Sequence, residues 1–221
     1  MTKKLGFYLL WLLLLALVPA TILRQLNIHN ILTSHAAMAN LIQRFLGLTI
    51  YILLFWQIML GAYMQKWTEK LGGWVLRFHI TEGVLIYLLI LLHPLMFAFF
   101  RYFSGLGLDP IFVYFGYCLY CSTILDFYYT LGRVALLLIT VGVLAGLFRT
   151  STPFMRVNWR KFHVVNYVVF LIAGIHGLSL GTDFRTMPFF AFAIVAYLLV
   201  LYTIGRKLPA LLTSYKTWLQ N

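Results

Sequence analysis

The sequence predicts an all-α membrane protein, a six-transmembrane helical bundle with both termini in the cytoplasm. Of its 221 residues, 62% are hydrophobic and only 10% are charged, and the mean hydropathy is +0.90. A soluble domain is about half apolar and about a quarter charged, so a soluble core of this size cannot bury so much apolar surface. The apolar residues form long unbroken runs, which are typical of transmembrane helices rather than of the short alternating strands of a β-barrel.

Six apolar runs are each long enough to cross a hydrocarbon layer of about 30 Å. We expect the spans at residues 5–23, 41–63, 76–100, 131–148, 162–180 and 187–205. No repeat or hydrophilic domain separates them in the sequence. Residues 1–221 are therefore predicted to form a single domain.

The segments around these spans also have predicted places. Lys3 and Lys4 precede the first apolar run as in a signal peptide, but we expect this run to remain as the first helix, because the later spans need a consistent orientation. The connection 101–130 is rich in Tyr and Phe, and we expect it to rest at the membrane interface. The tail 206–221 is predicted to form a short helix on the membrane surface.

The 17 Lys and Arg residues are divided unequally between the two sides of the predicted bundle. The larger group lies at the amino terminus, in the second and fourth connections and in the tail: Lys3, Lys4, Lys66, Lys70, Arg77, Arg149, Arg156, Arg160, Lys161, Arg206, Lys207 and Lys216. The smaller group lies on the other side: Arg24, Arg44, Arg101, Arg133 and Arg185. The positive-inside rule places the first side in the cytoplasm, and we expect a multi-pass protein of a bacterial plasma membrane. The net charge of +12 does not indicate nucleic-acid binding, because the basic residues are not gathered on one face.

Four of the six histidines lie inside two of the predicted spans. His79 and His93 are 14 residues apart in the third span, and His163 and His176 are 13 residues apart in the fifth. Both spans run in the same direction, so His79 matches His163 near the cytoplasmic side and His93 matches His176 near the outer side. At a rise of about 1.5 Å per residue, the two levels are about 20 Å apart. Imidazoles on opposite faces of an iron porphyrin give a six-coordinate haem suited to electron transfer.

The two spacings differ in how they aim the side chains. Fourteen residues return to within about 40° of the starting face of a helix, whereas thirteen fall about 140° short of four full turns. We expect either a bulge or bend near Gly174 and Gly177 or a rotation between the two haem planes. Gly83, Gly174 and Gly177 also suit the close approach of a flat macrocycle.

Two segments carry a resemblance to a known family. They are RFHITEGVLIYLLILLHP at 77–94 and the stretch 132–176, which begins GRVALLLITVGVLAGLFR and ends WRKFHVVNYVVFLIAGIH. These residues resemble the ferric reductase-like transmembrane domain that ferric reductases and NADPH oxidases share. The resemblance covers most of the chain from the second span onward. It implies two b-type haems, the inner one held by His79 and His163 and the outer one by His93 and His176.

The same resemblance implies an oxidoreductase component of electron transport, a haem subunit rather than a complete reductase, since no Gly-rich dinucleotide fingerprint accompanies these motifs. We expect the electrons to come from a quinol or from a cytoplasmic flavoprotein. In the second case the flavin would belong to that partner protein. On the outer side we expect the acceptor to be ferric iron, oxygen or a partner redox protein.

Two alternatives remain open at this point. The segment WRKFHVVNYVVFLIAGIH also resembles the haem-containing membrane subunit of a periplasmic methionine sulfoxide reductase. A haem-free transporter or scaffold would instead use the histidines for protons or metal. The sequence lacks the acidic clusters and the repeated, interrupted helices that are typical of transporters.

Arginines are the expected partners of the haem propionates, because guanidinium groups bind carboxylates bidentately. We expect Arg77 and Arg160 to serve the inner haem, since they are close in sequence to its histidines. Candidates on the outer side are Arg24, Arg44, Arg101 and Arg185.

Glu82 follows His79 by three residues, so the two side chains share one side of a helix. Three interpretations are open: the carboxylate orients the haem edge, pairs with Arg77, or accepts a proton when the haem is reduced. We favour structural pairing, because an unpaired carboxylate at that depth is costly.

Cys118 and Cys121 form a C-x-x-C motif in the outer connection. No histidine follows it, so covalent c-type haem attachment is not predicted. A disulfide, a redox-active dithiol or two buried thiols remain open. His29 and His35 are predicted to be solvated loop residues rather than metal ligands, because no carboxylate cluster accompanies them.

Overall fold

The computed structural model describes residues 3–26 and 28–219, and this part of the chain contains helices and short connections but no strand. The helices in chain order are α1 (Lys3–Leu15), α2 (Leu17–Ile22), α3 (Ile28–Thr33), α4 (His35–Ala62), α5 (Met64–Leu71), α6 (Trp74–Phe103), α7 (Pro110–Phe115), α8 (Ile124–Leu147), α9 (Pro153–His163), α10 (Asn166–Leu180) and α11 (Phe189–Leu219). Two 3₁₀ turns, η1 (Leu23–Gln25) and η2 (Asp183–Arg185), complete the described elements.

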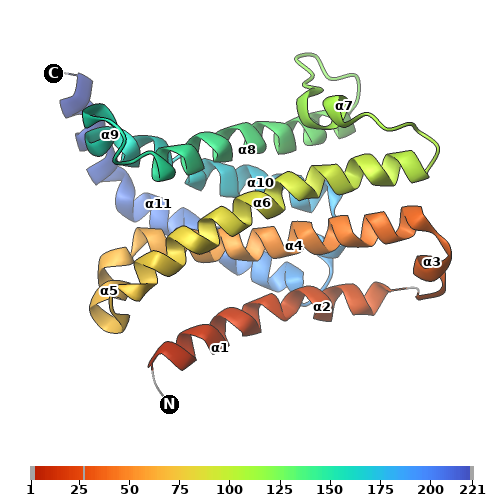
Figure 1. The fold of residues 1–221 in the computed structure, drawn as a ribbon, viewed down its shortest axis with the longest axis horizontal. Helices are drawn as coiled ribbons and strands as arrows, with labels where there is room; N and C mark the ends of the chain where they lie inside the picture. Colours follow the sequence, from red (N-terminus) through yellow and green to blue (C-terminus); the bar gives the residue numbers. More distant parts are fainter. Residues whose placement is uncertain (1–2, 27, 220–221) are drawn as a thin grey trace.

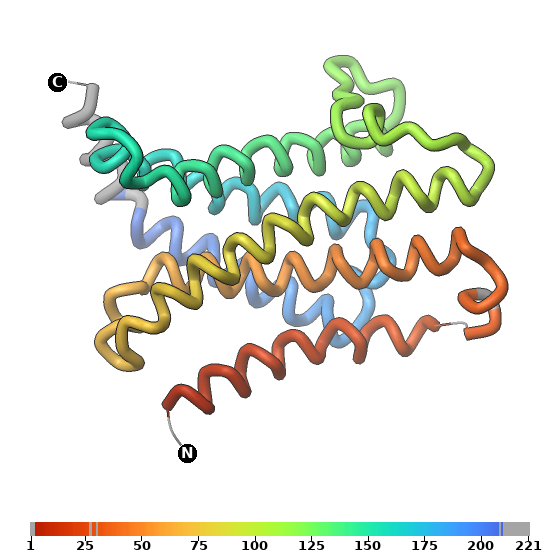
Figure 2. The backbone as a smooth tube through the Cα atoms, in the orientation of Figure 1, coloured from red at the N-terminus to blue at the C-terminus, as the bar shows by residue number. Residues whose placement is uncertain are grey.

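The long helices lie side by side in one bundle (Figure 1). One end of the bundle contains α5, α9 and the start of α1, and α11 runs towards it (Figures 1 and 2). The helices α3 and α7 lie at the opposite end. We refer to these as the α5–α9 end and the α3–α7 end. The chain therefore crosses the bundle an even number of times.

The prediction of six spans is confirmed: within the described part of the chain, six helical stretches are long and apolar enough to cross a membrane. They are Lys3–Gln25, His35–Ala62, Trp74–Phe103, Ile124–Leu147, Pro153–Leu180 and Phe189–Lys207. Most extend beyond the expected limits, because a helix can continue into the interfacial layer, where hydropathy no longer marks it.

The helix α4 lies at the centre of the bundle. Its residues from Ile50 to Trp56 are all buried, which leaves no face of that stretch for lipid. It contacts α6 over its length and also packs against α1, α2, α10 and α11. Tyr51 of α4 stacks on Phe170 of α10 with ring centroids 4.6 Å apart. A helix that is apolar all round is typical of this surrounded position.

An aromatic cluster holds α1 against the bundle near the α5–α9 end. Phe7 is buried, and its ring centroid lies 5.2 Å from that of Trp56, 5.0 Å from that of Trp74 and 5.1 Å from that of Phe78. Tilted and edge-to-face arrangements of this kind are favourable between aromatic rings. The first predicted span is thus packed as an integral helix, and its loss would expose these rings.

Glu82 is buried, and its partners lie on two other helices. Trp11 Nε1 of α1 and Gln57 Nε2 of α4 each donate to one of its carboxylate oxygens at 2.5 Å. The expected pair with Arg77 is wrong, since Arg77 is exposed and makes no ion pair among the described residues. Five residues turn a helix by about 140° beyond one full turn, so the two side chains point to different faces. Glu82 therefore joins α1, α4 and α6.

The fifth predicted span consists of two helices. α9 ends at His163 and α10 begins at Asn166. In the junction, the N–H groups of Val165 and Tyr167 donate to the carbonyls three residues earlier at 3.2 and 3.1 Å. Such bonds tighten the turn and end the regular α-helix. His163 and His176 therefore lie on separate helices, which removes the mismatch in direction that one continuous helix would impose.

Of the two alternatives for this span, an interruption is found at the α9–α10 junction and not near Gly174 and Gly177, through which α10 continues. These glycines instead admit aromatic rings. A Cβ at Gly174 would lie 3.0 Å from the ring of Tyr197, and one at Gly177 would lie 2.6 Å from the ring of Phe184.

The tail after residue 205 and the connection between α6 and α8 were also predicted from the sequence. The tail is helical, as expected, and continues α11 to Leu219; its place on the membrane surface stays a prediction. In the connection after α6, the short helix α7 packs back onto α6, and Tyr114 Oη donates to the carbonyl of Leu91. This contact keeps the aromatic connection close to the α3–α7 end of the bundle.

Glu82→Leu is expected to lower the melting temperature of the detergent-purified protein, because Trp11 and Gln57 lose their buried acceptor. Each unsatisfied buried donor costs about 1–3 kcal/mol. Glu82→Gln costs less, since its oxygen still accepts from Trp11 and the Gln57 amide can turn to accept from the new NH₂ group. Glu69→Leu is the control, because Glu69 is exposed. A Glu82→Leu variant that melts with the control would show that these hydrogen bonds do not hold α1.

Candidate cofactor-binding site

The four intramembrane histidines lie in two facing pairs at different depths of the bundle. His79 and His93 project from α6, while His163 ends α9 and His176 lies in α10. The ring centroids of His79 and His163 are 6.2 Å apart. His93 and His176 line one cavity nearer the α3–α7 end. The structure thus brings together the residues that the sequence analysis paired.

The separation of His79 and His163 suits a metal between the two rings. A bond of about 2 Å from metal to imidazole nitrogen on each side, plus roughly 1 Å from that nitrogen to the ring centre, puts two trans imidazoles about 6 Å apart. The observed 6.2 Å matches this value. Direct stacking of the rings is ruled out, because their planes are inclined by 73°.

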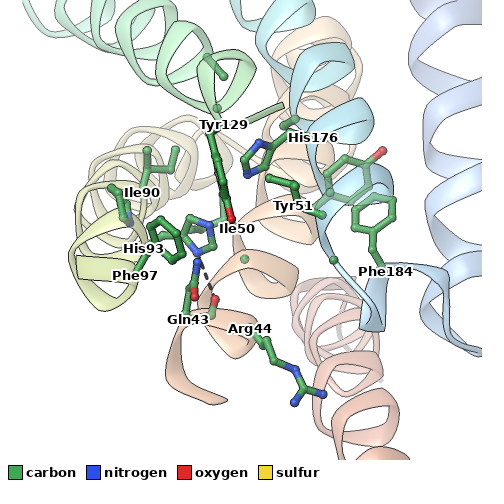
Figure 3. A pocket seen from close by; sticks show the side chains of 18 of the residues that line it. Gln43, Arg44, Ile50, Tyr51, Ile90, His93, Phe97, Tyr129, His176 and Phe184 are labelled. Atoms are coloured by element: carbon green, nitrogen blue, oxygen red, sulfur yellow. Dashed lines mark hydrogen bonds between the residues drawn. The ribbon is translucent and has the colours of Figure 1, made fainter. Parts of the chain in front are cut away.

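A cavity of about 580 Å³ lies between His93 and His176. Figure 3 shows His93 of α6 and His176 of α10 pointing into it from different sides, with Tyr129 of α8 beside them. The volume falls within the range of small-molecule and cofactor pockets, about 300–1,000 Å³. Its lining is mainly apolar and aromatic, with a few charged groups at the α3–α7 end, which suits an amphiphilic macrocycle.

Backbone carbonyls fix the tautomer of three of the histidines. Nδ1 of His93 lies 3.0 Å from the carbonyl oxygen of Gln43, Nδ1 of His163 lies 2.8 Å from that of Gly142, and Nδ1 of His176 lies 2.9 Å from that of Tyr128. A carbonyl oxygen only accepts, so Nδ1 carries the proton and Nε2 keeps its lone pair. A neutral imidazole oriented in this way is a metal ligand.

Each histidine ring also lies against a glycine of the neighbouring helix. On α4, Gly47 faces His93 and Gly61 faces His79; on α8, Gly132 faces His176 and Gly146 faces His163. A Cβ would lie 3.0 Å from the ring of His93 at Gly47, and 2.7 Å from that of His176 at Gly132. The two remaining glycines leave 3.4 Å to the facing ring.

The carbonyls and the glycines form one repeated arrangement. Each of the three accepting carbonyls lies four residues before the glycine that faces the same histidine, as Gln43 does before Gly47. In an α-helix that carbonyl already accepts from the glycine N–H, and a missing Cβ opens its second lone pair to the imidazole. By the same register, His79 corresponds to Gln57. Nδ1 of His79 is buried and makes no hydrogen bond among the described residues.

The sequence analysis missed these glycines, although a signal was present. Gly47 and Gly61 are separated by 14 residues, as are Gly132 and Gly146, and this is also the separation of His79 and His93. Of the glycines named instead, Gly83 lies nearest to the side chain of Gln57, at 3.8 Å from a Cβ. The relevant glycines lie on the helices that face the histidines, because a helix needs room for its neighbour's side chain and not for its own.

The charged groups of the cavity lie at its α3–α7 end. Arg44 donates to both oxygens of Asp183 at 2.5 and 2.6 Å, which occupies its guanidinium fork. Arg133 is buried at 7% exposure, and its Nε donates to the carbonyl of Val113 at 3.1 Å. Its guanidinium also lies 5.0 Å from the ring centre of Phe112. Arg133 makes no ion pair with a described residue, so its charge is available to an anion in the cavity.

The predicted arginines of the inner site lie on the surface. Arg77 is exposed on α6, and Arg160 is exposed on α9 with its guanidinium 5.5 Å from the ring centre of Trp159. Neither lines the described cavity. On the outer side, Arg133 is the buried arginine of the cavity, and it was absent from the predicted propionate partners.

The remaining candidates have clear places. Cys118 and Cys121 form a disulfide. His29 and His35 are exposed, and no group of three or more His, Cys, Asp or Glu residues occurs among the described residues. Each intramembrane histidine pair therefore offers two protein ligands, which suits a metal whose other ligands belong to a macrocycle.

Comparisons with protein-family models, with curated proteins and with solved structures give no match for this chain. The fold and the site define the class by themselves: a multi-pass helical bundle with two pairs of intramembrane histidines at different depths.

Gly132→Ala is expected to destabilise the protein by about 1–3 kcal/mol, because its Cβ overlaps the His176 ring and overpacked cores lose stability of this order. Gly61→Ala has a smaller effect, since its Cβ leaves 3.4 Å to His79. Gly205→Ala is the matched control, since a Cβ there meets nothing within 4 Å. Melting temperatures in detergent test this order, and a Gly132→Ala variant as stable as Gly205→Ala would contradict the close approach.

Proposed function

We propose that this protein is a transmembrane electron-transfer subunit that binds two b-type haems, one at each histidine pair. The observation that carries the proposal is the repeated arrangement of facing histidines, each against a glycine, with three Nδ1 atoms tied to backbone carbonyls. A histidine that only packs in a membrane helix has no need of a glycine opposite it or of a partner imidazole at the distance of a bridging metal.

The residues present fit a haem at each level. His79 with His163 would hold one haem and His93 with His176 the other, each through Nε2. Bound haems would supply one-electron oxidation and reduction at iron. Carbonyl acceptors on Nδ1 raise the basicity of the ligating nitrogen and hold the ring in one orientation. Arg133 would neutralise a propionate of the outer haem at the α3–α7 end, whereas Arg77 and Arg160 remain the predicted partners of the inner haem.

Arg133 suits a propionate because it is a buried cation that makes no ion pair with a described residue. A buried charge is costly unless it is paired. The carbonyl of Val113 and the ring of Phe112 stabilise the guanidinium but leave its net charge in place. An anionic group entering the cavity would supply the missing charge and use the remaining guanidinium N–H donors.

The basic residues support an orientation for the transfer. The α5–α9 end carries the larger group of Lys and Arg residues, so we place it in the cytoplasm. Electrons would then enter from a cytoplasmic flavoprotein or a quinol at the His79–His163 level and leave from the His93–His176 level. With two histidines on each iron no coordination position is open, so an outer acceptor such as ferric iron, oxygen or a redox protein would react at the cofactor edge.

This function agrees with the resemblance to the ferric reductase-like transmembrane domain and places the chain among oxidoreductase components of electron transport. The haem-free alternative predicts colourless protein. The methionine sulfoxide reductase-type alternative shares the haem sites and differs in the outer partner.

The purified protein, expressed with ample haem, is expected to bind two low-spin haems per chain, measured by oxidised and dithionite-reduced visible spectra together with haem quantification. His93→Ala and His79→Ala each lower this value to one or less, because each removes an axial ligand. His35→Ala, which changes an exposed histidine outside both pairs, keeps the wild-type value. Protein that folds but binds no haem would overturn the proposed function.

Arg133→Met is expected to lower the midpoint potential of one haem, because loss of a nearby cation favours the more positive, oxidised iron. A shift of tens of millivolts is the expected size, where about 59 mV corresponds to a tenfold change in a one-electron equilibrium. Arg160→Met changes an exposed arginine near the other histidine pair and leaves the potential of the outer haem unchanged. A redox titration followed at the haem absorbance measures both variants, and an unchanged outer-haem potential in Arg133→Met would contradict the role of Arg133.

A further inference from the structure

The disulfide between Cys118 and Cys121 lies in the connection between α7 and α8, at the same end of the bundle as the His93–His176 cavity (Figure 1). The two cysteines are three positions apart. A disulfide stabilises a fold mainly by restricting the unfolded chain, and this restriction is smallest for short loops. The disulfide therefore contributes little to the stability of the folded state.

Hydrogen bonds connect the disulfide to the outer histidine. The backbone N–H of Cys118 donates to Thr130 Oγ1 at 3.3 Å, and Cys118 Sγ lies 3.1 Å from the same oxygen. Thr130 lies two residues after Tyr128, and the carbonyl of Tyr128 accepts a hydrogen bond from His176 Nδ1 at 2.9 Å. Two residues of an α-helix rise by about 3 Å. The sulfur of Cys118 and the imidazole of His176 thus contact the same half-turn of α8. Tyr129, which lies between Tyr128 and Thr130 in the sequence, lines the cavity.

The disulfide is also open to the outside. Leu119 and Tyr120, the two residues between the cysteines, are 92% and 97% exposed, and both cysteines are only half-buried. The sulfur atoms therefore lie between the cavity and the surface of the protein, and no described helix covers the loop that carries them.

We propose that the Cys118–Cys121 disulfide is a redox centre of this protein, which accepts electrons from the outer histidine level and passes them to a disulfide-containing protein on the same side of the membrane. This inference rests on the proposed haem function. The disulfide takes up two electrons and two protons from water, its S–S bond breaks, and two thiols form. The two electrons would be supplied one at a time by the two one-electron cofactors proposed at the histidine pairs, and two such cofactors per chain match the demand of one disulfide.

The transfer to the partner is a thiol–disulfide exchange. The Cys118 thiolate attacks one sulfur of the partner disulfide and forms a mixed disulfide, and Cys121 then displaces the partner's sulfur. The loop disulfide forms again, and the partner leaves with two thiols. Thr130 Oγ1 is placed to donate a hydrogen bond to the Cys118 thiolate, and a donor of this kind favours the charged form. Cys118 is therefore the attacking residue.

The first test needs no haem. The full-length protein in lipid nanodiscs is incubated with millimolar reduced glutathione, and its thiols are counted by mass spectrometry after alkylation. We expect two new thiols per chain, at Cys118 and Cys121, with the helical circular dichroism unchanged. Structural disulfides resist reduction by glutathione. A disulfide that stays oxidised under these conditions would overturn the proposal.

The second test asks whether the electrons arrive through the histidine level. The haem-loaded protein is reduced photochemically without oxygen or small thiols, and the labelled thiols are followed together with the haem spectrum. We expect two thiols per chain in the wild type, several-fold slower labelling in Thr130→Val, and loss of labelling in His176→Ala. The double variant with Cys118→Ser and Cys121→Ser keeps the haem spectrum and gives no label.

The outcomes separate the two proposals. Absence of a haem spectrum rejects the proposed function, whatever the state of the cysteines. Reduced haems with no new thiols reject the redox role of the disulfide alone. Equal labelling in the wild type and in His176→Ala also rejects it, because the reductant would then act on the disulfide directly.

Discussion

The arrangement of this bundle depends on the hydrogen bond between an imidazole Nδ1 and a backbone carbonyl of the facing helix. A helical carbonyl already has its N–H partner, so a second donor can reach it only where the covering Cβ is missing. This condition accounts for the glycine opposite His93, His163 and His176, and it fits the close contact of α4 with α6 and of α8 with α10. The same bond leaves the lone pair of Nε2 free. Helix spacing, ring orientation and ligand chemistry therefore have one cause.

Much of the fold could be predicted because it follows from the solvent. Long apolar runs were enough to predict the six helical stretches that can cross a membrane. The junction between α9 and α10 could not be predicted in this way, since Val164 and Val165 continue the apolar pattern and neither is a helix breaker. With the helix divided there, His163 and His176 both bond to carbonyls of α8, which is a contact between helices that local hydropathy does not encode.

The candidate site likewise contains features that the sequence predicted and features that it did not. The histidine pairs could be predicted, because their spacing on two parallel spans is a local property of the sequence. Arg133 and the partners of Glu82 could not, because they depend on contacts between helices distant in the sequence. Trp11 and Glu82 are 71 residues apart. Arg133 looked like an ordinary charge at the start of a span, and its burial beneath Phe112 became visible only once α7 was placed on the bundle.

The interruption after His163 also bears on how such a protein can change over evolutionary time. One continuous helix would couple the two levels mechanically, so that any rotation improving one histidine would spoil the other. With α9 and α10 as separate rigid segments, substitutions that reorient α9 leave the imidazole on α10 in place. Selection can then act on each level separately, so a lineage can change the α5–α9 half of the bundle while the α3–α7 half retains its geometry.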